Sequence, residues 1–230
     1  MPTGRGWLAA GVVAVIVALG VVLSITGVFG GDPQAPPAAA APSTATDAPE
    51  ESVCGLSEVL LDGTVAKAPA AQWALVGTFA APTVPGQGPG IVEQDGFRSC
   101  FAHTPTGAVV AAVNLAALGS YPPVRERFNT QALAPGAGRE VVLSRPAAGG
   151  ASDGPRLQLA GFRLLRYTGD QADVDLALLT STGSMLGFTG YLVWAEGDWK
   201  VRLADDGSDL SSVSPISTLD DYIPWQADRG

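Results

Sequence analysis

The sequence is poor in positive charge, in cysteine and above all in histidine. It has 13 Lys and Arg against 22 Asp and Glu, which gives a formal net charge of −9 at pH 7. This balance disfavours non-specific binding to nucleic acid, which depends on basic side chains that neutralise phosphates. One histidine and two distant cysteines do not make the ligand set of a zinc site. We therefore expect no nucleic-acid partner, no metal and no cofactor.

Charge is also missing near the N-terminus, where residues 7–29, from Trp7 to Phe29, form one apolar run. A run of about 20 apolar residues is long enough to cross a bilayer as a helix. Arg5 precedes it, whereas the following stretch up to Lys67 contains acidic residues and no Lys or Arg. The positive-inside rule then predicts a single-pass cell-membrane protein with residues 1–6 in the cytoplasm and an extracytoplasmic C-terminal domain.

A cleaved secretory signal is the main alternative to this membrane anchor. The apolar core of such a signal usually has ~7–15 residues, and the present run is longer. The small residues 38–41, which a peptidase could cleave, lie far beyond the run. The length of the run therefore favours a retained anchor over cleavage.

Residues 30–52 have the composition of a spacer, and residues 53–230 that of one folded domain. The spacer is rich in Pro, Ala, Ser and Thr and has too few large apolar side chains to form a core. Its prolines favour a semi-extended chain. The remainder is long enough for a single domain with its own core.

The two cysteines, Cys54 and Cys100, both lie on the predicted outer side of the membrane. An even number of cysteines in an oxidising compartment predicts a disulfide. Its loop of about 46 residues would stabilise the domain by roughly 4 kcal/mol in the chain-entropy model. Two buried, unpaired thiols are the alternative.

A buried helix is predicted after His103. Thr104 or Thr106 is a suitable N-cap, a proline follows in the first turn, and Gly119 is a suitable end. The residues between them are apolar on every side except at Asn114, which indicates a helix surrounded by the core. Asn114 has two interpretations: a structural hydrogen bond to a loop, or a polar group in a cavity between helix and sheet.

The segments on either side of this helix are less regular. Residues 73–79 are expected to form a strand or an extended arm, and residues 81–90 a loop rich in Pro and Gly. A short strand is expected around Phe97. A second, amphipathic helix is predicted from Pro123 to about Leu133, and the glycines at 136 and 138 would end it.

The last third of the chain is predicted to form an antiparallel sheet. Strands are expected at 157–167, 172–178, 185–194 and 198–203, with turns at Gly169 and Gly197. Period-two alternation buries one face of such a sheet and exposes the other. The fold class is therefore α+β, with helices packed on a curved antiparallel sheet. The exposed face should carry Arg166, Asp173, Asp175, Lys200 and Arg202.

Several residue patterns suggest chemistry but lack the context that the chemistry needs. Ser152 lies in a G-x-S-x-G pattern, yet a loop surrounds it instead of the strand and helix of a nucleophile elbow. His103 would have to be the base of any such site, and no partner residues match it. Two further patterns also lack the context of a binding site. The acidic residues Asp205, Asp206 and Asp209 do not have the spacing of a calcium-binding loop. The glycines Gly86, Gly88 and Gly90 are not followed by a helix, which a phosphate-binding loop needs.

Several stretches together resemble an uncharacterised domain common in actinobacterial membrane proteins, often encoded near conjugation genes. These stretches include GFRSCFAHTPTGAVVAAVN at 96–114, LAGFRLLRY at 159–167 and WAEGDWKVRL at 194–203. Anchor, spacer and α+β domain also resemble the periplasmic assembly factors of type IV secretion and conjugation systems. The ending LVWAEGDWKV at 192–201 is similar to the last hairpin of their cone-shaped fold, named after nuclear transport factor two. This resemblance implies a scaffold rather than an enzyme.

Two functions from different classes follow. The first is a non-enzymatic, membrane-anchored extracytoplasmic scaffold or interaction domain in a conjugative transfer or secretion apparatus. Its partners would be other membrane or envelope proteins, or further copies of itself. The second is an extracytoplasmic domain that binds a small ligand in a cavity between helix and sheet. A deep apolar pocket favours the second function, and an open apolar surface patch favours the first.

Overall fold

The computed structural model describes residues 51–146 and 156–227. The predicted cytoplasmic tail, the predicted transmembrane helix, nearly all of the spacer and Ser152 therefore lie outside the described residues. Within these residues, no single helix has the length and apolarity that crossing a membrane requires. The pair Pro105–Gly119 and Pro122–Ala132 passes the same test only when the two are taken together, across a bend of 99°.

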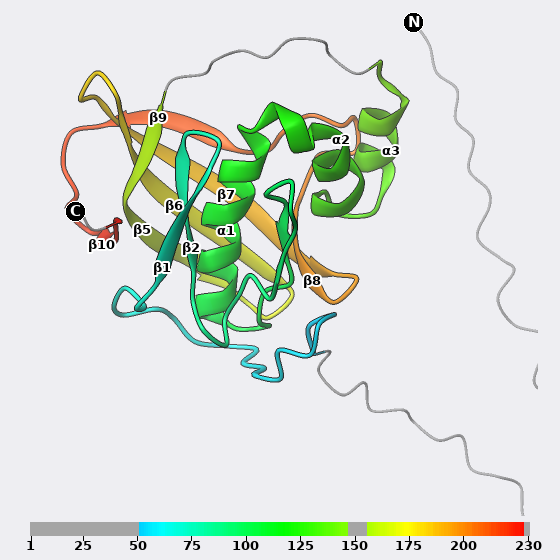
Figure 1. The fold of residues 1–230 in the computed structure, drawn as a ribbon, viewed down its shortest axis with the longest axis horizontal. Helices are drawn as coiled ribbons and strands as arrows, with labels where there is room; N and C mark the ends of the chain where they lie inside the picture. The colour runs from blue at the N-terminus through cyan, green and yellow to red at the C-terminus, as the bar shows by residue number, and fades with distance from the viewer. Residues whose placement is uncertain (1–50, 147–155, 228–230) are drawn as a thin grey trace, which may run out of the picture. The chain divides into compact units, whose positions relative to one another are not determined.

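The fold has both helices and sheets, as the α+β prediction requires (Figure 1). A six-stranded antiparallel sheet has the order β10-β5-β6-β7-β8, and β9 pairs with β7 beside β8. Two further pairs, β1 with β2 and β3 with β4, form small hairpins. The elements are β1 (Gln72–Val76), β2 (Phe79–Thr83), β3 (Ile91–Val92), β4 (Arg98–Ser99), α1 (Pro105–Gly119), the 3-10 turn η1 (Pro122–Val124), α2 (Arg125–Arg127), the π-helical turn η2 (Phe128–Ala132), α3 (Ala137–Ser144), β5 (Leu157–Tyr167), β6 (Gln171–Thr180), β7 (Met185–Ala195), β8 (Asp198–Val201), β9 (Ser212–Ile216) and β10 (Ile223–Pro224).

Helix α1 lies across the apolar face of the sheet and forms the centre of the core (Figure 1). The side chain of Thr104 caps it by accepting a hydrogen bond from the backbone N–H of Gly107, at 2.8 Å. Its buried residues come from all sides of the helix, and Asn114 is the polar one among them. The helix packs against β5, β6, β7 and β8 on one side and β2 on another. The predicted buried helix is thus confirmed.

The central strands follow the predicted alternation. Alternate residues of β6, from Ala172 to Leu178, are at most 5% exposed and form the sheet face beneath α1. Gly169 and Gly197 adopt positive φ angles of 75° and 70° in the turns that the sequence predicts. Two register shifts between β5 and β6 interrupt the pairing, and such bulges bend a strand.

The prediction of a second helix from Pro123 to about Leu133 is wrong, both because the segment is not one continuous helix and because the glycine at 138 does not end it. The chain makes three short pieces there, η1, α2 and η2, and a separate helix α3 follows. Gly138 does not end a helix but lies within α3, where a Cβ atom would collide with the backbone oxygen of Ala204. The glycine therefore allows α3 to approach the chain beyond β8, and the sequence pattern does not distinguish this role from a helix end.

The prediction for the segment at 73–79 is confirmed in part. Residues 73–76 belong to strand β1, but the chain then turns, with Gly77 at a φ of 60°, and Phe79 begins the second strand of the β1–β2 hairpin. Residues 81–83, which the sequence places in a loop, belong to β2. Strands β9 and β10 were not predicted, since their short, exposed segments show no clear alternation.

Candidate functional site

The structure contains an apolar pocket of about 460 Å³ between α1 and the sheet. Residues from α1 and from β6, β7 and β8 form its walls, and residues of η2 and α3 cover it. Figure 1 shows α2 and α3 near the C-terminal end of α1, whose residues line the pocket. Pockets that bind small molecules have volumes of roughly 300–1,000 Å³ and mostly apolar walls. The main apolar lining residues are Phe79, Ala112, Leu115, Ala116, Phe128, Leu133, Val142, Leu157, Leu178, Phe188, Leu192, Val201 and Leu203.

Small residues on facing elements explain why this space is open. Ala112, Ala116 and Gly119 line it from α1, and Gly190 lines it from β7. A Cβ atom added at Gly190 would meet the ring of Phe188 at 3.4 Å, an ordinary contact. No neighbouring backbone segment therefore comes so close that only glycine fits at position 190. The missing side chain of Gly190 instead leaves volume inside the pocket.

A few polar groups lie at the rim of the pocket. The carboxylate of Asp209 accepts hydrogen bonds from the backbone N–H and the hydroxyl of Ser211, both at 2.8 Å. The hydroxyl of Ser120 donates to the carbonyl of Ala117 at 2.8 Å. Among the hydrogen bonds between described residues, none involves the side-chain amide of Asn129. The pocket therefore offers an apolar interior and one amide that is available for hydrogen bonding at its edge.

The opposite end of α1 is filled, and His103 lies there. The imidazole ring stacks on Trp194 with a centroid distance of 3.9 Å and an interplanar angle of 6°, and its edge contacts Trp199. His103 is only 3% exposed, and its Nε2 lies 3.0 Å from the carbonyl oxygen of Gly169. The arrangement is that of a packed core histidine. Nowhere in the described ranges do three or more His, Cys, Asp or Glu residues gather as metal ligands.

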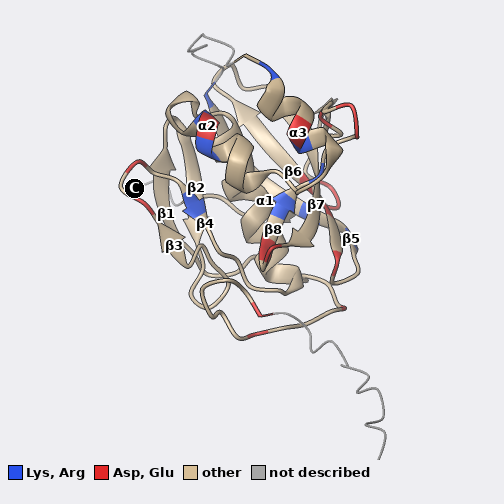
Figure 2. Ribbon diagram, turned by 90° about the vertical axis from the view of Figure 1, so that its right-hand side faces the viewer, with Lys and Arg blue, Asp and Glu red and all other residues tan. Residues whose placement is uncertain are grey.

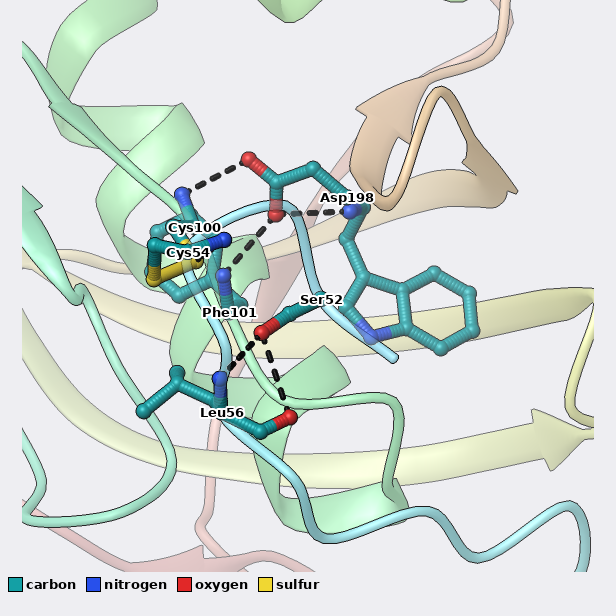
Figure 3. Close-up of a disulfide and its surroundings, with 7 residues drawn as sticks. Ser52, Cys54, Leu56, Cys100, Phe101 and Asp198 are labelled. Atoms are coloured by element: carbon teal, nitrogen blue, oxygen red, sulfur yellow. Dashed lines mark hydrogen bonds between the residues drawn. A yellow bond between two sulfur atoms is a disulfide. The ribbon is translucent and has the colours of Figure 1, made fainter. Parts of the chain in front are cut away.

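Cys54 and Cys100 form the predicted disulfide, with a Cα–Cα distance of 6.1 Å (Figure 3). The buried carboxylate of Asp198 lies beside it and accepts hydrogen bonds from the backbone N–H groups of Cys100 at 2.7 Å and Phe101 at 2.9 Å. It also accepts from the N–H of Trp199 at 2.9 Å. Burial raises the pKa of Asp198, while these amides and Lys200 oppose the shift. The sequence shows Asp198 only as one polar position of an alternating strand.

Two glycines of the predicted Pro/Gly loop pack against this disulfide. A Cβ atom at Gly90 would overlap the sulfur of Cys54, and one at Gly88 would meet Phe101 and the carbonyl of Cys100. Gly86, by contrast, has no neighbour within 4 Å of such an atom. Gly88 and Gly90 thus serve close packing, a role that becomes visible only once the cysteine pairing is known.

Asn114 does not line the apolar pocket. Its amide nitrogen donates to the carbonyls of Pro82 at 3.0 Å and Val110 at 2.9 Å. Its oxygen accepts a hydrogen bond from the guanidinium of Arg98 at 3.4 Å. Of the two interpretations of Asn114, the structure has the hydrogen-bonded one, in which the amide ties α1 to β2.

The sheet face opposite α1 is not uniformly exposed. The prediction that this face exposes Asp175 and Lys200 is wrong, because both side chains are buried. Asp175 is 4% exposed because Arg163, Thr189 and Tyr222 surround its carboxylate; the hydroxyl of Tyr222 donates to it at 2.6 Å. Burial raises the pKa of Tyr222 to about 12, and the contact with the Asp175 carboxylate adds to this shift.

Lys200 is likewise buried, at 9% exposure. Its ammonium donates to the carbonyl of Gln131 at 2.6 Å and lies 3.7 Å from Glu196. Neither Asp175 nor Lys200 is available to a partner, because segments distant in sequence cover them.

The other three residues of this face lie close together. The guanidinium groups of Arg166 and Arg202 both donate to the side-chain oxygen of Gln171, at 3.0 and 3.3 Å. Arg202 also lies over the ring of Tyr191, 5.5 Å from its centroid. Oδ1 of Asp173 and Nε of Arg202 are two of the five buried side-chain polar atoms, among the described residues, that have no hydrogen-bond partner. Figure 2 shows basic and acidic positions scattered over the ribbon, with no continuous basic stripe.

The acidic residues after β8 form a loop rather than a cluster of free carboxylates. The side chain of Asp206 accepts a hydrogen bond from the backbone N–H of Ser208 at 2.9 Å, and hydrogen bonding to Ser208 lowers its pKa. Asp209 makes the equivalent bond to Ser211. These are the Asx turns typical of loops.

Comparison with known protein families gives one assignment. The family described as "Domain of unknown function (DUF8175)" matches residues 34–224, so the chain belongs to this family. No curated protein and no solved structure matches the chain.

Proposed function

We propose that this protein is a non-enzymatic, membrane-anchored extracytoplasmic domain that binds a small apolar molecule. The observation that carries the proposal is the 460 Å³ pocket between α1 and the sheet. Its position between a helix and a sheet is the one that the ligand-binding hypothesis expects, and its volume and apolar lining are typical of small-molecule sites. The proposed location outside the cytoplasm rests on the apolar run at residues 7–29 and is consistent with the disulfide.

The lining residues indicate the chemistry of the ligand. Among the lining residues that the structure describes, Asp209 is the one that carries a charge, and hydrogen bonds from Ser211 already engage its carboxylate. The interior therefore suits an uncharged hydrocarbon or aromatic body, since a buried charge without a partner is costly. The side-chain amide of Asn129 is placed to bind a hydroxyl or carbonyl at one end of that body.

Several features support binding rather than catalysis. His103 stacks between aromatic rings at the far end of α1, and the described part of the pocket lining contains no histidine, cysteine or lysine. The titratable side chains in that lining are Asp209, whose carboxylate is engaged by Ser211, and Tyr191, whose ring lies beneath Arg202. General acid–base catalysis needs a titratable group that can exchange a proton with the substrate within hydrogen-bonding reach. We propose further that the bulged antiparallel sheet crossed by α1 is a cone of the nuclear-transport-factor-two type.

A fluorescent titration with the neutral probe N-phenyl-1-naphthylamine tests the proposal. Ala116 lines the pocket from α1, and its replacement in Ala116→Phe fills the space. Ala137, at the exposed start of α3 and outside the lining, provides the matched control Ala137→Phe. We expect Ala116→Phe to weaken probe binding by roughly tenfold or more, and Ala137→Phe to leave it unchanged. Equal affinity in the wild type and Ala116→Phe would reject the pocket as the binding site.

A second function, assembly with envelope proteins of a conjugative or secretion apparatus, has its own supporting observation. Arg166 and Arg202 converge on Gln171, next to a buried oxygen of Asp173 that lacks a partner. Charged groups of this kind set partner choice more than fold stability. The double variant Arg166→Glu/Arg202→Glu should lose co-purifying membrane proteins while keeping its melting temperature, whereas unchanged co-purification would remove this face from consideration.

A further inference from the structure

A second pocket, of about 680 Å³, lies away from α1 and has a different character. It is formed by the β1–β2 hairpin, the start of β5, the turn between β6 and β7 and the residues that follow β10. None of the described residues lines both pockets. Its described lining is Trp73, Ala80, Arg156, Gln158, Leu159, Leu179, Thr180, Ser181, Gly183, Gln226 and Ala227.

The charge of this pocket is opposite to that of the whole chain. Arg156 is the one charged residue in the lining just given, although the chain carries a net charge of −9. Within residues 51–146 and 156–227, no ion pair or side-chain hydrogen bond involves Arg156, Gln158 or Gln226. One guanidinium and two amides are therefore available around the same pocket, and a guanidinium binds a carboxylate through two parallel hydrogen bonds.

Trp73 provides a fixed aromatic wall. Its ring packs edge-on against Trp225 with a centroid distance of 5.2 Å. Trp225 is in turn held by a hydrogen bond from its indole N–H to the carbonyl of Pro69, at 3.1 Å, and by edge contact with Phe162. An aromatic ring held in this way presents apolar area to a ligand at little entropic cost.

We propose that this second pocket binds an acidic sugar, that is, a sugar ring that carries a carboxylate. The carboxylate would bind Arg156, the hydroxyl groups would exchange hydrogen bonds with the amides of Gln158 and Gln226, and the C–H face of the ring would pack on Trp73. A side-chain amide both donates and accepts, which matches the dual character of a sugar hydroxyl. The proposal goes beyond the apolar ligand proposed above and does not depend on it.

Titration of the full chain with sodium glucuronate, followed by NMR of the tryptophan indole groups, tests this site. Glucose is the matched neutral ligand, since it has the same ring without the carboxylate. Arg156→Gln removes the charge while keeping a hydrogen-bonding group, and Arg125→Gln alters an exposed arginine of α2 outside the pocket. Gln158→Ala provides a second pocket variant that leaves the aromatic packing intact.

We expect glucuronate to shift the Trp73 indole signal at millimolar concentration and glucose to bind roughly tenfold more weakly. Arg156→Gln should abolish this preference for the acid, Gln158→Ala should weaken both sugars, and Arg125→Gln should change neither. The proposal is overturned if glucuronate and glucose bind alike to the wild type, or if Arg156→Gln keeps the preference. Ala116→Phe should leave glucuronate binding unchanged, so that failure of one pocket is distinguishable from failure of the other.

Discussion

The two ends of helix α1 face the same sheet, yet one is filled and the other is open. At the N-terminal end, His103 and Trp199 are buried, and the indole N–H of Trp199 donates to the carbonyl of Ala102 at 3.0 Å. At the C-terminal end, Ala116 and Gly119 leave room for the apolar pocket. The difference is one of side-chain size on the helix, because aromatic rings pack against the first end, whereas α1 contributes the small residues Ala112, Ala116 and Gly119 to the pocket at the second.

This contrast separates what holds the domain together from what is available for binding. The disulfide, the carboxylate of Asp198 and the stacked rings all lie at the filled end, where substitutions should mainly affect stability. At the open end, substitutions should mainly affect binding, because fewer atoms lose contacts there.

The largest effect should come from removing the disulfide at the filled end. We expect Cys54→Ser to lower the free energy of unfolding by about 4 kcal/mol, because the unfolded chain is no longer closed into a loop. Urea denaturation under oxidising conditions measures this change. Reduced wild type should match the variant, and a variant with wild-type stability would show that the bridge does not stabilise the domain.

The next effect concerns Asp198, which holds three backbone amides at the same end. Asp198→Asn should cost about 2 kcal/mol at pH 7, since a buried N–H group then lacks its acceptor. The conservative Asp206→Asn, in an exposed loop, is the control and should change the free energy of unfolding far less.

The stability that Asp198 contributes should also depend on pH. Burial raises its pKa above the usual 3.8, so the folded protein keeps this proton where the unfolded chain has lost it. The part of this contribution that comes from proton binding is therefore fully present below pH 3.8 and is lost as the pH rises through the raised pKa, whereas the part that comes from the backbone hydrogen bonds remains at pH 7. The difference in unfolding free energy between wild type and Asp198→Asn should shrink from pH 4 towards pH 7, and a difference that grows would mean that the amides outweigh burial.

A pair of glycine substitutions in α1 compares the two ends directly. In Gly107→Ala, the new methyl group would collide with the backbone oxygen of Ala102, and we expect a loss of roughly 1–3 kcal/mol. In Gly119→Ala, the methyl group would meet the ring of Phe128 at 3.5 Å. The higher helix propensity of alanine should then leave stability unchanged or raise it by up to about 1 kcal/mol. Thermal denaturation of both variants gives the comparison, which fails if the two melting temperatures change alike.

The sequence predicted the elements whose signals are local. Thr104 and Gly119 bound α1 as expected, and the turns at Gly169 and Gly197 separate strands with clear period-two alternation. The disulfide followed from the number of cysteines and the proposed compartment. Each of these predictions depends on residues that are close in the chain or on composition.

The sequence did not reveal features that depend on distant segments. Asp175 and Lys200 alternate like exposed residues, but Tyr222 and Gln131 cover them from other elements. The apolar pocket arises because Ala116 and Gly190, far apart in the chain, line the same space without filling it. No local pattern distinguishes a small residue that lines a cavity from one that allows close packing, as Gly138 does.

Native mass spectrometry of the full chain, purified from its own membranes, tests most directly whether the open end of α1 is a binding site. We predict that the wild type and Ala137→Phe carry one bound small molecule and that organic solvent extracts it as an uncharged, largely apolar compound. Ala116→Phe should be folded and lack the bound mass. An equal bound mass in Ala116→Phe, or none in the wild type, would contradict the proposed function.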